Sequence, residues 1–183
     1  MTKLLVISGP SGVGKNSLIV ELLKNTPSLH KTVSYTTRPP RKNEVDGEHH
    51  HYVSKEKFEE MKEQGLLAEY SEHFGHFYGT AKSEIEKILT SGDVLLEIDV
   101  NGAMRIKDQF PEAISIFVAP PSLEELESRL RKRGTESEEA IQTRLARASL
   151  EMRLKDQFNH VIINDVFETA VVNLTTLVTS LGI

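Results

Sequence analysis

A glycine-rich segment near the N-terminus has the residue types and spacing of a phosphate-binding loop. Residues 9–15 read G-P-S-G-V-G-K, directly after the apolar run 4–7 and before a stretch whose apolar residues repeat with helical spacing. In that context the glycines let backbone N–H groups curl around an anion, the helix N-terminus adds partial positive charge, and the lysine reaches the outer phosphates. The segment therefore predicts a P-loop that binds a nucleoside triphosphate.

The position after Lys15 departs from the usual P-loop pattern. A serine or threonine is expected there, because its hydroxyl helps to hold Mg²⁺. This chain has Asn16, followed by Ser17. The carbonyl oxygen of Asn16 and the hydroxyl of Ser17 are both oxygen ligands that a hard cation accepts, so the sequence leaves the choice between them open.

Arginine is concentrated in two short segments of a chain whose net charge is −5. Seven of the nine arginines are Arg38 and Arg41 in one segment, and Arg129, Arg131, Arg133, Arg144 and Arg147 in the other. A general nucleic-acid-binding surface needs an excess of basic residues, which this chain lacks. Guanidinium groups bind phosphate oxygens in bidentate geometry. We therefore expect small, highly charged anions as ligands and no nucleic-acid partner.

Length and composition indicate one globular domain of 183 residues, with 38% hydrophobic and 27% charged residues. The chain has no cysteine, which excludes disulfides, thiolate zinc sites and cysteine nucleophiles and permits a reducing compartment. The apolar run 4–7 is shorter than a signal-peptide core, and no run approaches the length of a membrane helix. We expect a cytoplasmic protein with no membrane partner.

Apolar runs and helical patterns alternate along most of the chain. Buried strands are expected at 4–7, 94–98, 114–118 and 161–163, each followed by a helical pattern, and capping boxes predict helix starts near Leu123 and Glu136. Such alternation predicts an α/β fold with a parallel sheet covered on both faces. Segment 34–80 breaks the rhythm with a proline-rich turn, a cluster of three consecutive histidines and one helix near 55–64, so we interpret it as an insertion beside the main sheet.

The order of the motifs resembles the guanylate kinase family, whose members transfer phosphate from ATP to GMP. The matching segments are 8–12 (SGPSG), 34–41 (SYTTRPPR), 44–47 (EVDG), 78–80 (YGT), 97–103 (EIDVNGA), 133–135 (RGT) and 161–165 (VIIND). The resemblance implies the P-loop nucleoside monophosphate kinase fold, a single domain with a five-stranded parallel core sheet. Its core would comprise 1–33, 81–128 and 148–183, with a GMP-binding insertion at 34–80 and a helical lid at about 129–147.

The resemblance also implies an acceptor site in the insertion. The family residues that hold the GMP phosphate map onto Ser34, Arg38 and Arg41, and the guanine-reading carboxylate maps onto Glu69, with Tyr78 and Thr80 nearby. Guanine presents N1–H and an exocyclic amine as two donors on one edge, which an ionised carboxylate accepts, whereas adenine presents a bare N1 acceptor. A Thr80 hydroxyl can donate to guanine O6, so both contacts favour guanine.

One acceptor position differs from the family. Where relatives usually carry a tyrosine that helps to bind the GMP phosphate, the chain has His50, within His49, His50 and His51. A histidine can still donate to phosphate, more strongly when protonated, so we expect phosphate binding to weaken as pH rises. The three histidines could instead suggest a metal site, but adjacent residues of an extended segment point to alternate faces and do not converge on one ion.

Two acidic residues and the lid complete the implied site. Asp99 follows the strand at 94–98, at the edge where ligands bind in open α/β sheets, and in the family Glu97 and Asp99 lie near the magnesium waters and the guanine amine. Either carboxylate could instead be a structural partner of Lys15. Arg129 matches a family arginine but could pair with Glu125 four residues away. We interpret Arg147 as structural. The adenine contact would fall on Asn164 or Asp165.

The implied reaction is in-line attack of a GMP phosphate oxygen on the γ-phosphorus of ATP, with Mg²⁺ as cofactor. We expect Lys15, Arg38, Arg133 and Arg144 to be catalytic and Asn16, Ser17 and Asp99 to hold Mg²⁺, directly or through water. The expected ATP-binding residues are Gly9, Pro10, Ser11, Gly12, Val13, Gly14, Lys15, Asn16, Ser17, Arg133 and Asn164. The expected GMP-binding residues are Ser34, Arg38, Arg41, His50, Glu69, Tyr78, Thr80 and Asp99.

Two other functions were weighed against this reaction. One is a non-catalytic, guanylate-kinase-like module that binds proteins, and the other is a kinase of the same fold that acts on a phosphorylated sugar. Lys15 and the lid arginines argue against the first. Glu69, Tyr78 and Thr80 argue against the second, because a sugar acceptor needs no guanine reader. We expect ATP and GMP or dGMP as substrates, in purine nucleotide metabolism and salvage, and a monomer or homodimer.

Overall fold

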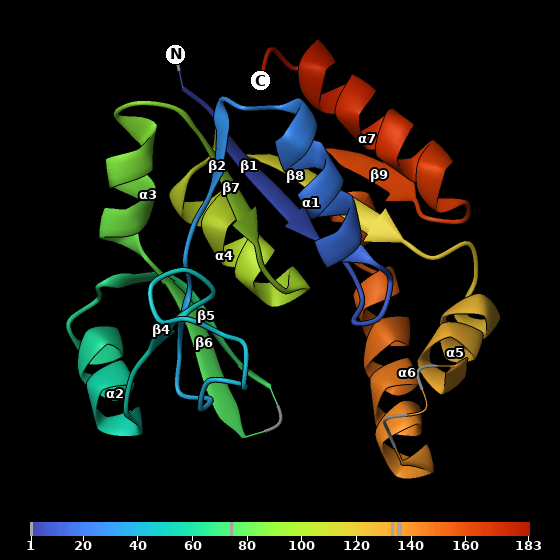
Figure 1. Ribbon diagram of the computed structural model, residues 1–183, viewed down its shortest axis with the longest axis horizontal. Helices are drawn as coiled ribbons and strands as arrows, with labels where there is room; N and C mark the ends of the chain where they lie inside the picture. The colour runs from blue at the N-terminus through green and yellow to red at the C-terminus, as the bar shows by residue number, and fades with distance from the viewer. Residues whose placement is uncertain (1, 74, 133, 135–136) are drawn as a thin grey trace.

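A computed structural model describes residues 2–73, 75–132, 134 and 137–183. Its main sheet has five parallel strands in the order β2-β7-β1-β8-β9 (Figure 1). The strands are β1 (Leu4–Ser8), β2 (Leu29–Lys31), β7 (Asp93–Glu97), β8 (Ile114–Ala119) and β9 (His160–Ile163). The predicted parallel five-stranded core is confirmed, and four of its strands lie where apolar runs predicted them.

Helices cover both faces of this sheet because its strands are apolar on both sides. Along β1, Leu5 and Ile7 pack with the residues of α1 and α7, whereas Leu4 and Val6 pack with those of α3 and α4. Successive strand side chains point to opposite faces, so an uninterrupted apolar run serves two cores at once. The helices are α1 (Lys15–Asn25), α3 (Lys82–Leu89), α4 (Val100–Gln109) and α7 (Phe167–Ser180).

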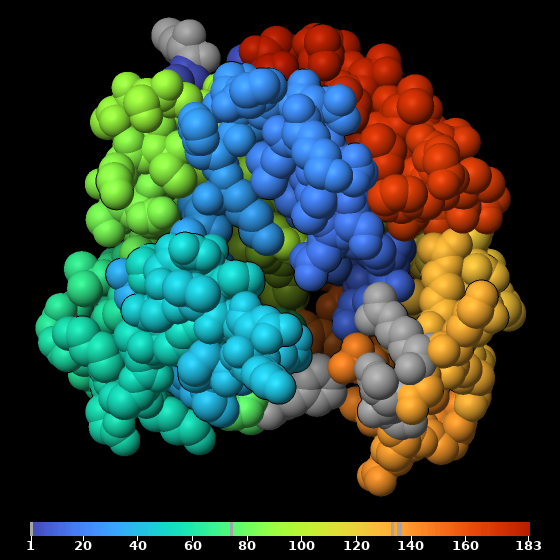
Figure 2. All heavy atoms as spheres, viewed as in Figure 1, coloured from blue at the N-terminus to red at the C-terminus, as the bar shows by residue number. Residues whose placement is uncertain are grey.

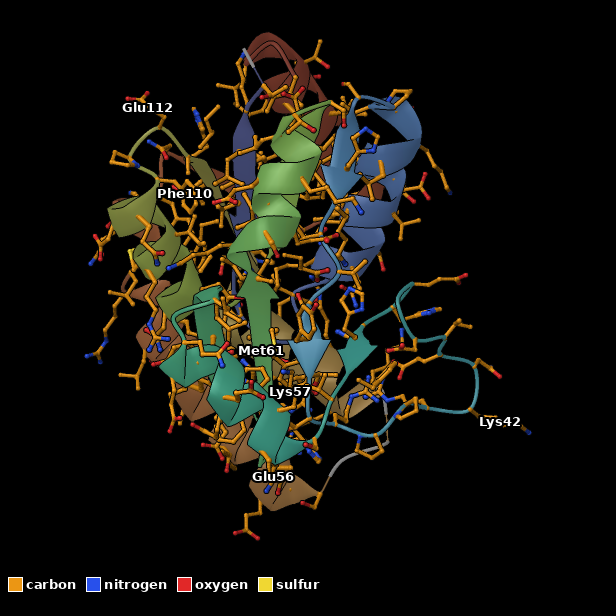
Figure 3. The ribbon with its side chains drawn as sticks, turned by 90° about the vertical axis from the view of Figure 1, so that its left-hand side faces the viewer. Lys42, Glu56, Lys57, Met61, Phe110 and Glu112 are labelled. Atoms are coloured by element: carbon orange, nitrogen blue, oxygen red, sulfur yellow. The ribbon has the colours of Figure 1, made fainter. Side chains whose placement is uncertain are left out.

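Residues 35–81 form a second, mostly antiparallel sheet with a small core of its own. Its strands lie in the order β4-β3-β6-β5 and comprise β3 (Tyr35–Thr36), β4 (His51–Tyr52), β5 (Leu67–His73) and β6 (His76–Ala81). Helix α2 (Lys55–Glu63) packs on this sheet through Phe58 and Met61, and Phe58 stacks on Phe77 with ring centroids 5.5 Å apart. Figure 3 shows α2 against these strands, with Lys42 at the outer end of the loop between β3 and β4.

Two further helices pack against each other on the other side of the molecule. These are α5 (Leu123–Lys132) and α6 (Glu138–Met152), which share a core of Leu126, Leu130, Ile141 and Ala148; a short 3₁₀ helix, η1 (Lys155–Gln157), follows. Helix α5 begins at Leu123 as predicted, with Ser122 Oγ accepting from the N–H of Glu125 at 3.1 Å. Helix α6 begins at Glu138 with Ser137 as its N-cap, so the predicted start near Glu136 was two residues too early.

The second sheet and the α5–α6 pair lie on opposite sides of a hollow below the main sheet. Figure 2 shows this hollow opening between the surface of residues 35–81 and that of α6. The carboxyl ends of β1 and β7 point toward it, so the residues that follow these strands are presented to the hollow (Figure 1). None of the described helices combines the length and the apolar character that crossing a membrane requires.

We predict that Phe58→Ala destabilises the second sheet far more than the main sheet. Phe58 is fully buried in a core with few other members, and truncating a buried phenylalanine typically costs about 3–5 kcal/mol. Amide hydrogen exchange should show lost protection in β5 and β6 and retained protection in β1 and β8. Val45→Ala, at a half-exposed position of the same segment, serves as the control. An equal loss of protection in both sheets would contradict this prediction.

Candidate functional site

The loop between β1 and α1 curls tightly, and glycine is required where it does so. At Gly9, φ is 140° and a Cβ atom would lie 2.1 Å from the carbonyl oxygen of Val118. At Gly14, φ is 96° and a Cβ atom would lie 2.6 Å from the amide nitrogen of Asn164. Larger residues at either position would push the loop off β8 or away from the end of β9. The loop is therefore fixed in shape by its packing on the sheet.

Lys15 closes this loop from the first turn of α1. Its ammonium donates to the carbonyl oxygens of Gly9 at 2.5 Å and Pro10 at 3.0 Å. Burial lowers the pKa of Lys15, while the negative charge of Glu97 opposes that change. The direct partners of Lys15 are therefore backbone carbonyls of its own loop. Phosphate oxygens would be stronger acceptors for this ammonium than neutral carbonyls.

Asn16 and Lys31 both bind Glu97. With its amide oriented to satisfy hydrogen bonding, Asn16 Nδ2 donates to Glu97 Oε2 at 2.9 Å and also approaches Oε1. Lys31 Nζ lies 2.5 Å from Glu97 Oε2. The carbonyl oxygen of Asn16 is consequently turned away from Glu97. Ser17, one residue further along α1, is exposed.

The far side of the P-loop meets the end of β9 and helix α5. Asn164 Nδ2 donates to the carbonyl oxygen of Val13 at 2.7 Å. Arg129 donates to the carbonyl oxygens of Asn164 at 2.8 Å and Asp165 at 3.2 Å, and it also pairs with Glu125 at 2.9 Å. A cavity of about 290 Å³ lies here, lined by Gly12, Val13, Gly14, Arg129, Lys132 and Asn164. This cavity is next to the glycine-rich loop, where a base attached to a bound triphosphate could be accommodated.

Helix α6 also reaches the P-loop. Arg144 Nη1 donates to Ser11 Oγ at 3.2 Å. This contact joins one of the arginines that the sequence assigned to a lid to the glycine-rich loop. Arg133, the other arginine that the sequence assigned to the lid, lies outside the described residues.

Glu44 organises the arginines that follow β3. Both of its oxygens accept from Arg38 Nη2 at 2.9 Å, and Oε2 also accepts from the N–H of Arg41 at 2.8 Å and the hydroxyl of Tyr52 at 2.9 Å. The Arg41 N–H contributes most to lowering the pKa of Glu44 to about 2, with Tyr52 and Arg38 adding to it against the effect of burial. Glu44 belongs to the 44–47 motif, which by itself indicates no role for this carboxylate. Its position three residues after Arg41 was the available signal.

The three consecutive histidines have three different surroundings. His49 Nδ1 accepts from the N–H of Val45 at 3.2 Å, and the ring of His51 lies 4.6 Å from that of Tyr35. His50 lies edge-on to Tyr52 and Tyr78, each 5.9 Å away between ring centroids. Burial, and then the charge of Arg38, lowers the pKa of His50. A charge-assisted contact from His50 to an anion is therefore restricted to lower pH than for an ordinary histidine.

Glu69 and Thr80 form a buried pair on neighbouring strands. They are opposite each other in the β5–β6 register, and Thr80 Oγ1 donates to Glu69 Oε1 at 2.7 Å. Burial raises the pKa of Glu69 to about 7, with the Thr80 hydrogen bond opposing and the charge of Asp99 adding to the rise. The hydroxyl of Thr80 thus points its proton at Glu69 in this structure. Gly102 lets the carboxylates of Glu69 and Asp99 approach the start of α4, since a Cβ atom there would lie 2.7 Å from Glu69 Oε2.

Asp99 caps α4, and its carboxylate also contacts side chains from two other elements. Its Oδ1 accepts from the N–H of Gly102 at 2.7 Å, while its Oδ2 lies 3.0 Å from Arg147 Nη2 and 3.2 Å from His73 Nε2. Burial opposes ionisation, but the hydrogen bonds from His73 and Gly102 outweigh it and lower the pKa of Asp99. Asp99 is therefore a carboxylate, held where the main sheet, the second sheet and α6 meet.

Some of the predicted residues thus come from elements on the two sides of the hollow. Lys15 and Asn16 come from the start of α1, Asp99 from the start of α4 and Arg144 from α6. Arg38 follows β3, and Glu69 and Thr80 lie on β5 and β6 of the second sheet. Such a site can bind two anionic groups, one at the P-loop and one beside the arginines of the second sheet.

Comparison with known proteins decides the family. The family model described as "Guanylate kinase" matches residues 1–181. The chain belongs to the guanylate kinase family. A guanylate kinase from Nostoc sp. is 50% identical over 169 residues, covering 92% of this chain and 85% of that protein. A guanylate kinase from Shewanella sp. is 46% identical over 179 residues, covering 97% and 86%.

Solved structures agree with this assignment. The crystal structure of guanylate kinase from Anaplasma phagocytophilum matches with a TM-score of 0.78 and 30% identity, covering 98% of this chain and 85% of that chain. The resemblance to the guanylate kinase family that the motifs indicated is therefore confirmed, together with the α/β fold. Guanylate kinases as a family are nucleotide kinases that phosphorylate GMP with ATP.

We predict that Glu69→Gln changes how stability depends on pH. The pKa of Glu69 is raised on folding from 4.5 to about 7, so the folded state binds this proton more tightly than the unfolded state. The associated stability is fully present below pH 4.5 and is lost as pH rises through about 7. It amounts to at most about 3 kcal/mol. Glutamine cannot titrate, so this part of the pH dependence should vanish in the variant.

Urea unfolding at pH 4.5 to 8.5 measures this difference. The free energy of unfolding of Glu69→Gln, relative to the unsubstituted chain, should increase with pH. Glu72→Gln, at an exposed position of the same strand, is the matched control and should follow the unsubstituted chain. Parallel pH profiles for Glu69→Gln and the unsubstituted chain would show that Glu69 ionises normally.

Proposed function

We propose that this chain transfers the γ-phosphate of ATP to GMP, giving ADP and GDP. The observation that carries the proposal is the buried Glu69–Thr80 pair of the second sheet. A buried carboxylate costs free energy unless hydrogen-bond donors satisfy it. The N1–H and amine of guanine supply two such donors, and adenine supplies neither on that edge. The proposal therefore explains why an acid is kept in a buried position.

The proposed acceptor site also includes residues that bind phosphate. We assign the GMP phosphate to Ser34, Arg38 and Arg41, with His50 and Tyr78 beside it. Arg38 Nη2 donates to both oxygens of Glu44, which holds the guanidinium in one orientation and reduces the conformational entropy lost on binding. With guanine bound to Glu69, the Thr80 hydroxyl can turn its proton to guanine O6. We expect dGMP to be an acceptor too, because the proposed contacts are made to the base and the phosphate and not to the sugar.

The proposed donor site is the P-loop with the lid. We assign the ATP phosphates to residues 9–17, the adenine side to Asn164, and charge on the transferring group to Lys15, Arg133 and Arg144. The attacking oxygen of GMP is already anionic, so no general base is needed, and the barrier comes from bringing two anions together. Exclusion of water by closure of the second sheet and α5–α6 around both nucleotides would prevent transfer to water.

The oxygen donors near the P-loop fit Mg²⁺, which prefers hard oxygen ligands. We propose that Asn16 and Ser17 hold it and that Asp99 does so through water, because both Asp99 oxygens already accept hydrogen bonds. When bound with ATP, Mg²⁺ supplies neutralising charge at the phosphates. The orientation of the Asn16 amide supports its carbonyl as the ligand, since its NH₂ group is taken up by Glu97.

The biological setting follows from the proposed substrates. We propose a role in purine nucleotide metabolism and salvage, in the cytoplasm, where ATP and GMP are available. A non-catalytic, protein-binding role is the alternative. It predicts no ADP release with any acceptor.

The proposed function predicts acceptor specificity that depends on Glu69. ADP release should be fast with GMP and slow with AMP or ribose 5-phosphate. Glu69→Gln should lower kcat/KM for GMP about 100-fold and leave that for AMP nearly unchanged, because hydrogen bonds to a charged acceptor contribute about 1.5–3 kcal/mol each. Glu72→Gln is again the control. An unchanged ratio of GMP to AMP in Glu69→Gln would overturn the assignment of the guanine reader.

The metal assignment predicts a difference between two neighbouring residues. Asn16→Ala should weaken binding of Mn²⁺, a spectroscopic substitute for Mg²⁺, to the ADP complex about tenfold, as measured by electron paramagnetic resonance. Ser17→Ala should change it less. The reverse ranking would assign the metal to the Ser17 hydroxyl instead of the Asn16 carbonyl.

A further inference from the structure

Arg147, which the sequence gave only a structural role, contacts groups from three different elements. From α6, its Nη2 donates to Asp99 Oδ2 at 3.0 Å, and its Nη1 lies 2.6 Å from His73 Nδ1 on β5. Its Nε donates to Glu151 Oε1 at 2.8 Å, one turn further along α6. All three nitrogen atoms of the guanidinium are therefore engaged. The contacts join the second sheet, the end of β7 and α6.

The contacts determine which nitrogen of His73 carries the proton. A guanidinium can only donate, so Nδ1 of His73 must accept from Arg147. In the neutral ring the proton is then on Nε2, which lies 3.2 Å from Asp99 Oδ2 and 2.9 Å from Ser71 Oγ. The neutral Nε2–H tautomer satisfies Arg147 and Asp99 together. His73 is thus a bridge, accepting on one side and donating on the other.

The position of this group in the molecule suggests more than local packing. Helix α6 and strand β5 lie on opposite sides of the hollow (Figures 1 and 2), and Asp99 contacts a side chain from each of them. Three residues earlier on α6, Arg144 contacts Ser11 of the P-loop, so this part of α6 lies beside the loop. The group of Arg147, His73 and Asp99 therefore lies where the two proposed nucleotide sites meet.

Solvent exposure argues against a mainly stabilising role. The side chain of Arg147 is 39% exposed, and ion pairs of exposed residues contribute little to stability. The side chain of Asp99, in contrast, is only 11% exposed. The partner that Arg147 holds is thus more buried than Arg147 itself. Arg147 therefore contributes more by fixing the orientation of the Asp99 carboxylate than by stabilising the fold.

We propose that Arg147 and His73 form a clasp that fixes Asp99 and ties α6 to β5, which makes Arg147 a positioning residue for the acceptor nucleotide. The inference rests on the proposed function, in which Asp99 faces GMP. With both oxygens held, Asp99 keeps one orientation before GMP binds, and such preorganisation favours affinity. Because the clasp spans both sides of the hollow, occupation of the ATP site should strengthen GMP binding through it.

Calorimetric titration of GMP, with and without a non-hydrolysable ATP analogue, tests the clasp. Arg147→Met should weaken GMP binding about tenfold, leave binding of the analogue alone within about twofold, and remove most of the strengthening of GMP by the analogue. Arg153→Met is the matched control, because Arg153 is exposed at the end of the same helix and its side chain makes no hydrogen bond or ion pair within the described residues. It should bind GMP as the unsubstituted chain does.

Variants of His73 distinguish the effect of its two hydrogen bonds from the effect of its side-chain volume. His73→Gln should bind GMP nearly normally, because its amide offers one acceptor and one donor, whereas His73→Leu should resemble Arg147→Met. The double variant Arg147→Met/His73→Leu should be no weaker than Arg147→Met alone, since both break one unit. Additive losses in the double variant would overturn the clasp.

Two further results would count against the inference in different ways. If the unsubstituted chain does not prefer GMP to AMP, the proposed function fails and the clasp fails with it. If the unsubstituted chain binds GMP but Arg147→Met binds it equally well, only the clasp fails. If Arg147→Met lowers the midpoint of thermal unfolding sharply and weakens GMP and the ATP analogue equally, the role of Arg147 is structural and the clasp is wrong.

Discussion

Two anionic nucleotides repel one another, and a site that binds both must offset this repulsion with cationic groups. The cations of this site are spread over both sides of the hollow: Lys15 and Arg144 beside the P-loop, Arg38 on the second sheet, and Arg147 between them. In the free protein these cations would themselves repel. Each of Arg38, Arg147 and Lys15 therefore has its own acceptor, a carboxylate for the arginines and backbone carbonyls for the lysine. The phosphates of the proposed nucleotides offer more hydrogen-bond acceptor oxygens than these groups. On binding, each cation can therefore change from its present acceptor to a phosphate without being left uncompensated.

The parallel sheet provides the frame for this arrangement, and the sequence predicted it well. Continuous apolar runs with no polar alternation are typical of strands buried on both faces, which is why β1, β7, β8 and β9 were placed correctly. Strand β2 has only three residues, two of them exposed, so periodicity had nothing to detect. Its place at the edge depends on pairing with β7, a contact more than 60 residues away along the chain.

The second sheet was far less predictable. Its helix α2 has a regular apolar pattern and was expected, but β3 and β4 are two residues long and are defined by pairing alone. The Glu69–Thr80 contact depends on the β5–β6 register, which shifts at Leu67 and Glu69. From the residues alone Glu69 is an ordinary acid, and only family resemblance gave it a role. The contact between His73 and Arg147 joins residues 74 positions apart, and no local sequence pattern predicts it.

The departure at Asn16 illustrates how a changed residue can keep the same pattern of hydrogen bonding. A serine or threonine hydroxyl at this position offers one donor and acceptor lone pairs. The amide of Asn16 also offers both, but on separate atoms: its NH₂ group binds Glu97, and its carbonyl is left for another partner. Because Lys31 also binds Glu97, that carboxylate can hold the amide in one orientation without moving itself. The acid at the end of β7 thus determines what the P-loop residue can present, which links the residue after Lys15 to a strand that follows it by nearly 80 positions.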